Sequence, residues 1–240
     1  MRRRMICKTG AALFLAALTG CAAHRDTEGR TETRVDPKYL FKTDIDRVLD
    51  AIRTQALASL FLIADKLYRR NPREWRKSGV LDRDTALTRL VAFRAAPPAG
   101  LDGKVEGEAA LMAFDPGYPG DRVAALVYGL VTMVDAACEG KEEFFVLDSL
   151  SAQKFHNAAR NMEIALWKLA SAKNAAGEPL LLANEINAEG QNLSFEREFG
   201  RVIGLLDLAA RIIEDQTGRL VSRAAQSLAT SLFLPVGALK

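Results

Sequence analysis

The feature that most restricts the fold of this chain is the spacing of its apolar residues, which recur every three or four positions through most of the sequence from Thr43 onward. Such a period is typical of amphipathic α-helices. Thr43 or Asp44 can cap the first of them. We expect this helix to end near Asn71-Pro72, because the residue before a proline is disfavoured in the helical conformation.

The region that follows is less regular. A short apolar run begins at Asp82 or Asp84 and reaches Phe93 with mixed spacing, so the sequence leaves a helix and a strand open there. Residues 95–120 are rich in proline and glycine, which favour turns. We expect a long surface excursion here, around a brief structured piece at residues 108–114.

A third helix is predicted from Asp121 to Cys138, and its middle, residues 123–134, is apolar on nearly all sides. A helix of this kind lies at the centre of a bundle or in a membrane. The apolar stretch is too short for the roughly 20 residues that span a bilayer, and charged residues flank it. We therefore expect it to be buried in the protein.

Three more helices complete the predicted fold. The fourth begins near Glu143 or Ser151 and ends near Lys173, the fifth spans residues 194–218, and the sixth spans residues 220–234. One broad face of the fourth helix is apolar, as a core face should be. The sequence thus predicts a mainly α protein, a single-domain helical bundle of about six helices over residues 39–240 with one long irregular excursion.

The N-terminus has a different pattern. It contains a cationic start, a short apolar run and then small residues before a cysteine, in the order of an export signal: Arg2, Arg3, Arg4, Lys8, residues 9–18 and Leu18-Thr19-Gly20-Cys21. The apolar run is much shorter than the roughly 20 residues that a membrane-spanning helix needs. Residues 22–38 carry mixed charges and threonines with hardly any large apolar side chain, which is typical of a flexible tether.

This start resembles the signal peptide of bacterial lipoproteins, over residues 1–21 only. The resemblance implies that residues 1–20 are removed and that Cys21 receives acyl chains, so that residues 21–38 link a membrane anchor to the domain. It also implies a location: in Gram-negative lipoproteins an aspartate after the lipidated cysteine favours the inner membrane, and here Ala22 holds that position. We therefore expect the outer membrane, with the protein facing the periplasm.

Removal of this leader changes the charge and the cysteine content. Four of the 33 basic side chains and none of the 30 acidic ones lie in residues 1–20, which leaves 29 against 30. Nucleic-acid binding needs a net basic face, so we expect no nucleic-acid partner. Cys7 leaves with the leader and Cys21 is expected to be acylated, so Cys138 has no partner for an intramolecular disulfide.

Polar candidates for a site are few. His156, Arg160 and Glu163 lie beside the apolar face of the fourth predicted helix. His156 and Glu163 fit an acid/base pair or half of a metal site, but helical metal ligands are normally three or four residues apart, and these are seven apart. We favour an Arg160–Glu163 ion pair at a helix edge and expect no metal.

Two further acidic residues are weaker candidates. Glu185 lies in a polar loop, residues 184–192, whose oxygen-bearing side chains resemble a calcium loop only in part, so we favour an ordinary connection. Asp207 lies within the apolar stretch of the fifth predicted helix. It fits a catalytic acid with a raised pKa, but we favour a pair with Arg211 or another arginine.

No catalytic or ligand motif is present after the leader: we find no phosphate loop, no His/Cys cluster and no nucleophile elbow. The sequence favours a non-catalytic envelope lipoprotein that binds a partner protein or assists assembly of an envelope complex, with no cofactor. Two alternatives stay open. One is an envelope hydrolase that uses carboxylates, and the other is a carrier of an apolar ligand between its helices.

Overall fold

The computed structural model describes residues 41–95, 97–187, 190–218 and 236–237, and the backbone of residues 23–25 and 31–33; the side chains of residues 185–192 are not described. In these residues the chain is mainly helical, as predicted. The elements are β1 (Ala23–Arg25), β2 (Thr31–Thr33), α2 (Asp44–Arg70), α3 (Pro72–Lys77), α4 (Arg83–Val91), α5 (Glu106–Met112), α6 (Arg122–Ala137), α7 (Ala152–Ser171), β3 (Glu185–Asn187), β4 (Gly190–Asn192) and α8 (Ser194–Thr217).

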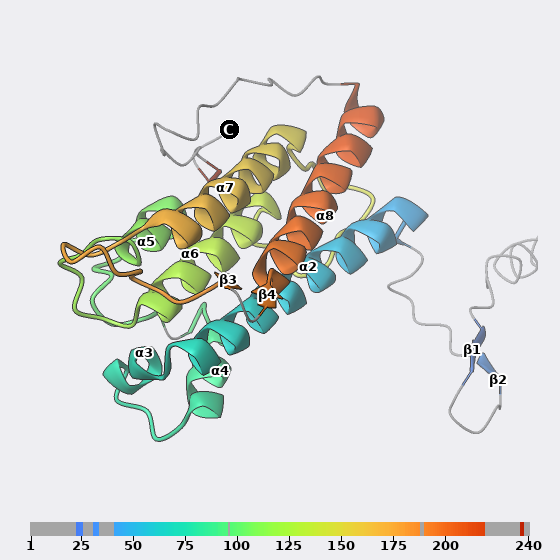
Figure 1. Cartoon of the computed structure of the whole chain (residues 1–240). Helices are drawn as coiled ribbons and strands as arrows, with labels where there is room; N and C mark the ends of the chain where they lie inside the picture. Colours follow the sequence, from blue (N-terminus) through green and yellow to red (C-terminus); the bar gives the residue numbers. More distant parts are fainter. Residues whose placement is uncertain are drawn as a thin grey trace, which may run out of the picture.

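Four helices form the body of the molecule (Figure 1). α2 and α7 each pack against both α6 and α8, so the four helices close into a ring. Tyr68 near the end of α2 meets Asp121 at the start of α6, and Lys66 of α2 meets Glu198 early in α8. Successive helices of the ring are therefore antiparallel, which is the up-down-up-down topology of a four-helix bundle.

Local sequence signals set the ends of α2. Thr43 and Asp46 form a capping box, in which the Thr43 hydroxyl accepts from the Asp46 N–H and the Asp46 carboxylate accepts from the Thr43 N–H. The helix stops at Asn71, as expected from Pro72. α3, in which Pro72 is the first residue, was not expected from the sequence. Proline is favoured at this position because the first N–H of a helix has no partner within it.

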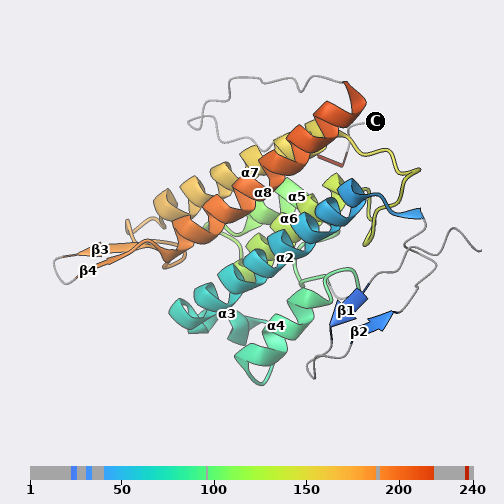
Figure 2. The ribbon, with the colours of Figure 1, turned by 90° about the vertical axis from the view of Figure 1, so that its right-hand side faces the viewer.

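Beside α3, the short apolar run left open by the sequence is a helix, α4. The Asp82 carboxylate caps it by accepting from the Thr85 N–H at 2.7 Å. α3 and α4 lie together at the end of the bundle where α2 ends (Figure 2).

α6 is buried on nearly all sides, as its sequence predicts. At Gly129 the backbone of α5 comes so close that a Cβ would lie 2.5 Å from the Ala110 nitrogen and the Glu106 carbonyl oxygen. α5 contains most of the brief structured piece expected at residues 108–114, but it is not a surface feature, because Ala109 and Ala110 are fully buried. The segment expected as a surface excursion therefore contributes to the core.

Most of the apolar face predicted for α7 is buried, whereas Leu166 is only partly buried and Ala170 is exposed. The core residues of this face are Phe155, Ala158, Ala159, Met162, Ala165 and Leu169. α8 packs along α7 and ends at Gly218, whose φ of 61° is the left-handed conformation that glycine adopts at helix ends. The predicted sixth helix, residues 220–234, lies outside the described residues, as do the leader and much of the tether.

Two short hairpins complete the description. β1 pairs antiparallel with β2 within the segment expected as a tether, and β3 pairs antiparallel with β4 in the polar loop after α7. Among the described helices, none combines the length and the apolar character needed to cross a bilayer.

Candidate functional site

The structure brings together four of the polar residues named from the sequence, at the contact of α7 and α8. Arg160 is their centre: its Nη2 lies 2.7 Å from Asp207 Oδ2 and its Nη1 lies 3.2 Å from Glu163 Oε1. His156 Nδ1 lies 4.0 Å from the other oxygen of Asp207. The expected Arg160–Glu163 ion pair is confirmed, and the arginine that pairs with Asp207 is Arg160 on the neighbouring helix.

Arg211, the other arginine considered for Asp207, lies 3.4 Å from Glu214 and 3.3 Å from Asp215 on its own helix. The sequence could not choose between the two arginines, because Arg160 lies 47 residues from Asp207 and only the packing of α7 on α8 joins them.

This cluster is better suited to joining two helices than to catalysis. The side chains of Asp207 and Glu163 are 42% and 38% exposed, and both carboxylates are held by the same guanidinium. Ion pairs this accessible contribute little, roughly 0–1 kcal/mol each. A carboxylate that the acid/base hypothesis did not pair with His156, that of Asp207, lies 4.0 Å from its Nδ1, a separation longer than a hydrogen bond.

Glu185 lies in β3, opposite Asn192 of β4. Its side chain is outside the described residues, so its candidate role stays a prediction. Beside this hairpin, Asn184 donates to Glu196 Oε1 at 2.8 Å, which links the loop to the first turn of α8. Within the described part of the chain, no group of three or more His, Cys, Asp or Glu residues is arranged to hold a metal ion.

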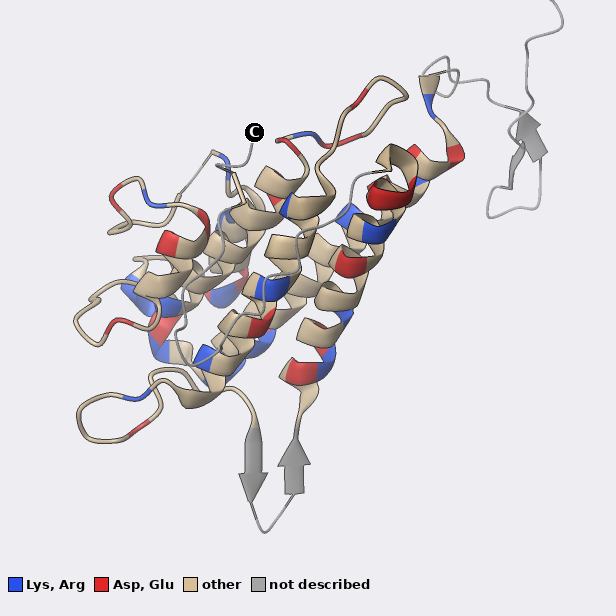
Figure 3. Ribbon diagram, turned by 90° about the horizontal axis from the view of Figure 1, so that it is seen from above, with Lys and Arg blue, Asp and Glu red and all other residues tan. Residues whose placement is uncertain are grey.

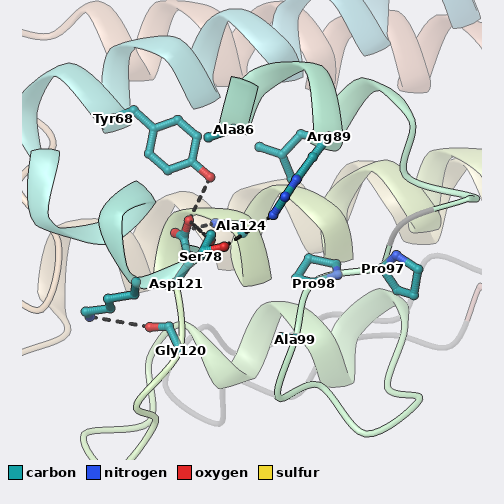
Figure 4. A pocket seen from close by; sticks show the side chains of 12 residues that line it. Tyr68, Ser78, Ala86, Arg89, Pro97, Pro98, Ala99, Gly120, Asp121 and Ala124 are labelled. Atoms are coloured by element: carbon teal, nitrogen blue, oxygen red, sulfur yellow. Dashed lines mark hydrogen bonds between the residues drawn. The ribbon is translucent and has the colours of Figure 1, made fainter. Parts of the chain in front are cut away.

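A pocket that the sequence did not indicate lies near the end of α2, where Tyr68 is one of its lining residues. Figure 4 shows this pocket from close by. It has a volume of about 240 Å³ and lies where α2, α4 and the start of α6 meet the proline-rich segment after α4. Lys77, Arg89 and Asp121 are its charged residues, and its apolar walls include Leu90, Pro97 and Pro98.

Asp121 is the buried acid of this pocket, only 4% exposed. It caps α6, since Oδ1 accepts from the Ala124 N–H at 2.9 Å. Oδ2 accepts from the Tyr68 hydroxyl at 2.9 Å and the Ser78 hydroxyl at 2.8 Å. Burial raises the pKa of this carboxyl above its ordinary value, although the three hydrogen bonds act in the opposite direction.

The polar side chains around Asp121 also have hydrogen-bond or salt-bridge partners. Burial, together with the charge of Asp121, raises the pKa of Tyr68, so its hydroxyl stays a donor. The neighbouring Glu74 accepts from the Arg122 N–H at 2.8 Å and forms a salt bridge with Lys77. A buried acid with a raised pKa in a pocket is a common mark of a functional site, but here both carboxylate oxygens already serve structural donors.

Within the described residues, Arg89 is the cation of the pocket that no carboxylate pairs: its hydrogen bond is from Nη1 to the Ser78 carbonyl oxygen, at 3.2 Å. The sequence shows only the cap at Asp121, because Tyr68 and Ser78 lie 53 and 43 residues before it and no local spacing connects the three.

No protein-family model, no curated protein and no solved structure matches this chain. The role of the protein has to be inferred from its own residues.

Proposed function

We propose that this protein is a lipid-anchored lipoprotein of the bacterial envelope, held at the periplasmic face of the outer membrane through Cys21, where it acts as a non-catalytic partner-binding or assembly factor. The observation that carries the proposal is the order of the first 21 residues: four basic side chains, a short apolar run, and Leu18-Thr19-Gly20 before the cysteine. The first described residue of the helical body is Phe41, so residues 22–40 separate the anchor from the bundle.

Two features of the bundle support binding rather than catalysis. The carboxylates of Glu163 and Asp207 are both engaged by Arg160, whereas a glycoside hydrolase needs two carboxyl groups that face its substrate. The buried carboxylate of Asp121 accepts three hydrogen bonds within the protein.

The pocket at Asp121 does not support the carrier alternative, because of its size. The pocket at Asp121, about 240 Å³, is smaller than the roughly 300–1,000 Å³ that is usual for small-molecule sites.

The anchor is tested by growing cells that express the full chain with labelled palmitate. The protein should take up the label and fractionate with the outer membrane, and Cys21→Ala should abolish both. Cys7→Ala is the matched control, because it removes a cysteine from the leader while keeping Cys21. Equal labelling of the wild-type protein and Cys21→Ala would show that the anchor is not at this residue.

The binding role is tested by chemical crosslinking in intact membranes, followed by affinity capture and mass spectrometry. A specific envelope protein that is captured with the anchored form, and lost with Cys21→Ala, supports the assembly role. Repeated captures of anchored protein without any specific partner would contradict it.

A further inference from the structure

Three large apolar side chains are exposed together at the end of the bundle where the tether joins it. Phe41 is 64% exposed, Val146 55% and Leu147 92%. Phe41 directly precedes α2, and Val146 and Leu147 lie in the loop between α6 and α7. The Val146 N–H donates to the Phe41 carbonyl oxygen at 3.0 Å, which places the two segments side by side. We call these three residues the tether-end patch.

Salt bridges and a hydrogen bond hold the loop that carries Val146 and Leu147 against the start of α2. Lys42 forms salt bridges with Asp50 of α2 and with Glu143 of the loop, the second at 2.9 Å. The other oxygen of Asp50 accepts from the Phe144 N–H at 2.8 Å. Burial tends to lower the pKa of Lys42, but these two carboxylates raise it overall, so the lysine stays charged. The loop is therefore fixed to the start of α2.

The turn that carries the patch is also closed internally. Asp148 accepts from the Phe145 N–H at 2.8 Å and pairs with Lys141, while Phe144 is buried in the core. Phe144 thus holds the turn to the core. Val146 and Leu147, two and three residues further along, point away from the core. Val146 and Leu147 are apolar, yet more than half of each residue is exposed to solvent. A fixed turn that exposes apolar side chains is typical of a contact surface.

We propose that the tether-end patch inserts into the interface of the bilayer that carries the anchor, which sets the orientation of the domain. The inference rests on the proposed lipidation of Cys21. The occupant follows from chain length: the 19 residues 22–40 separate Cys21 from Phe41, and even a fully extended chain of that length spans no more than about 65 Å. Of the described bundle, this patch is therefore the part nearest to the lipid along the chain.

The charges near the patch favour apolar insertion over attraction to anionic lipid. Lys42 pairs with Glu143 and Lys141 pairs with Asp148, so neither lysine is available to lipid phosphates. Figure 3 shows basic and acidic residues interspersed along the coloured ribbon rather than gathered by sign. Insertion should therefore depend little on salt, in contrast to electrostatic adsorption.

This orientation has a consequence for the rest of the molecule. α2 runs from the patch to the opposite end of the bundle, and a helix rises about 1.5 Å per residue, so Tyr68 lies roughly 36 Å from Asp44. Docking at the patch would hold α3, α4 and the Asp121 pocket away from the bilayer, facing the periplasm (Figures 1 and 2).

The test uses the full, lipidated protein in vesicles of phosphatidylethanolamine and phosphatidylglycerol. A nitroxide is attached at Leu147→Cys and, as the matched control, at Leu81→Cys, which is 94% exposed in the loop between α3 and α4. Cys138 is buried and does not compete for the label. Collisions with oxygen, which is concentrated in lipid, are compared with collisions with a water-soluble nickel complex.

We expect a several-fold higher ratio of oxygen to nickel accessibility at position 147 than at position 81, unchanged at higher salt. Adding Val146→Asp should bring the two ratios together while the protein stays vesicle-bound. Equal ratios in protein that floats with the vesicles would overturn the docking surface and leave the anchor standing. If the wild-type full-length protein purified from membranes carries no acyl chains and does not float with the vesicles, the proposed function is overturned, and the docking surface with it.

Discussion

Replacing Asp121 by alanine should lower the free energy of unfolding of this bundle more than the loss of an ordinary helix cap does. The substitution removes the cap of α6 and leaves the buried Tyr68 hydroxyl and the Ser78 hydroxyl without their acceptor. A cap contributes about 1 kcal/mol, and a stranded buried hydroxyl costs about 1–3 kcal/mol. With one cap and two hydroxyls, we expect the free energy of unfolding to fall by about 3–7 kcal/mol, a large part of the 5–15 kcal/mol that is usual for a domain.

The assay is urea unfolding followed by circular dichroism at the helical minimum. Asp82→Ala is the matched control, because Asp82 also caps a helix with its carboxylate, which accepts from the Thr85 N–H, but is exposed. Tyr68→Phe, which removes one of the three donors, should give an intermediate loss. If Asp121→Ala lowers the urea midpoint no more than Asp82→Ala does, the buried network does not stabilise the fold as argued.

Three further predictions concern the same bundle. Gly129→Ala should destabilise the bundle by about 1–3 kcal/mol or more, because the new Cβ collides with the backbone of α5. Gly204→Ala, in open space on α8, should instead stabilise it by about 0.5–1 kcal/mol. Thermal unfolding of both variants measures these changes, and two losses of stability of equal size would contradict the prediction. Because burial raises the pKa of Asp121, the folded state binds this proton more tightly than the unfolded chain, so its contribution to stability should fall as pH rises from about 4 through the raised pKa. Asp121→Asn should flatten that slope in urea midpoints measured against pH, and an unchanged slope would assign the titration to another group. Burial raises the pKa of the Cys138 thiol to about 12, so the thiol stays protonated at pH 8 in the folded protein. A thiol reagent at pH 8 should therefore modify Cys138 only when urea unfolds the protein. Rapid labelling of the native protein would contradict this and show that the end of α6 opens easily.

The helices were the most predictable part of the fold, because their signals are local. The three-and-four spacing, the Thr43 cap and the stop before Pro72 all act within a few residues, and the structure confirms α2 at those positions. The apolar middle of α6 likewise predicted its own burial. α3 was missed because six residues are too few to show a period. A brief structured piece was expected at residues 108–114 and α5 covers most of it, but the proline and glycine around it did not indicate that Ala109 and Ala110 are buried.

The site residues were predictable only where they share one helix. Arg160 and Glu163 are three residues apart on α7, so their ion pair could be read from the sequence. The pairing of Arg160 with Asp207 and the network of Asp121 with Tyr68 each depend on contacts between helices that lie far apart in the sequence.

The sequence by itself determined the helical class and, through the first 21 residues, the case for a lipid anchor, because both depend on patterns that a short stretch of chain carries in full. Only the tertiary structure decided that four helices close into a ring, that Asp121 is buried against Tyr68 and Ser78, and that Phe41 lies beside the turn at Val146 and Leu147. The physical reason is that local spacing fixes which face of a helix is apolar, whereas the choice of its neighbour depends on the packing of the whole chain.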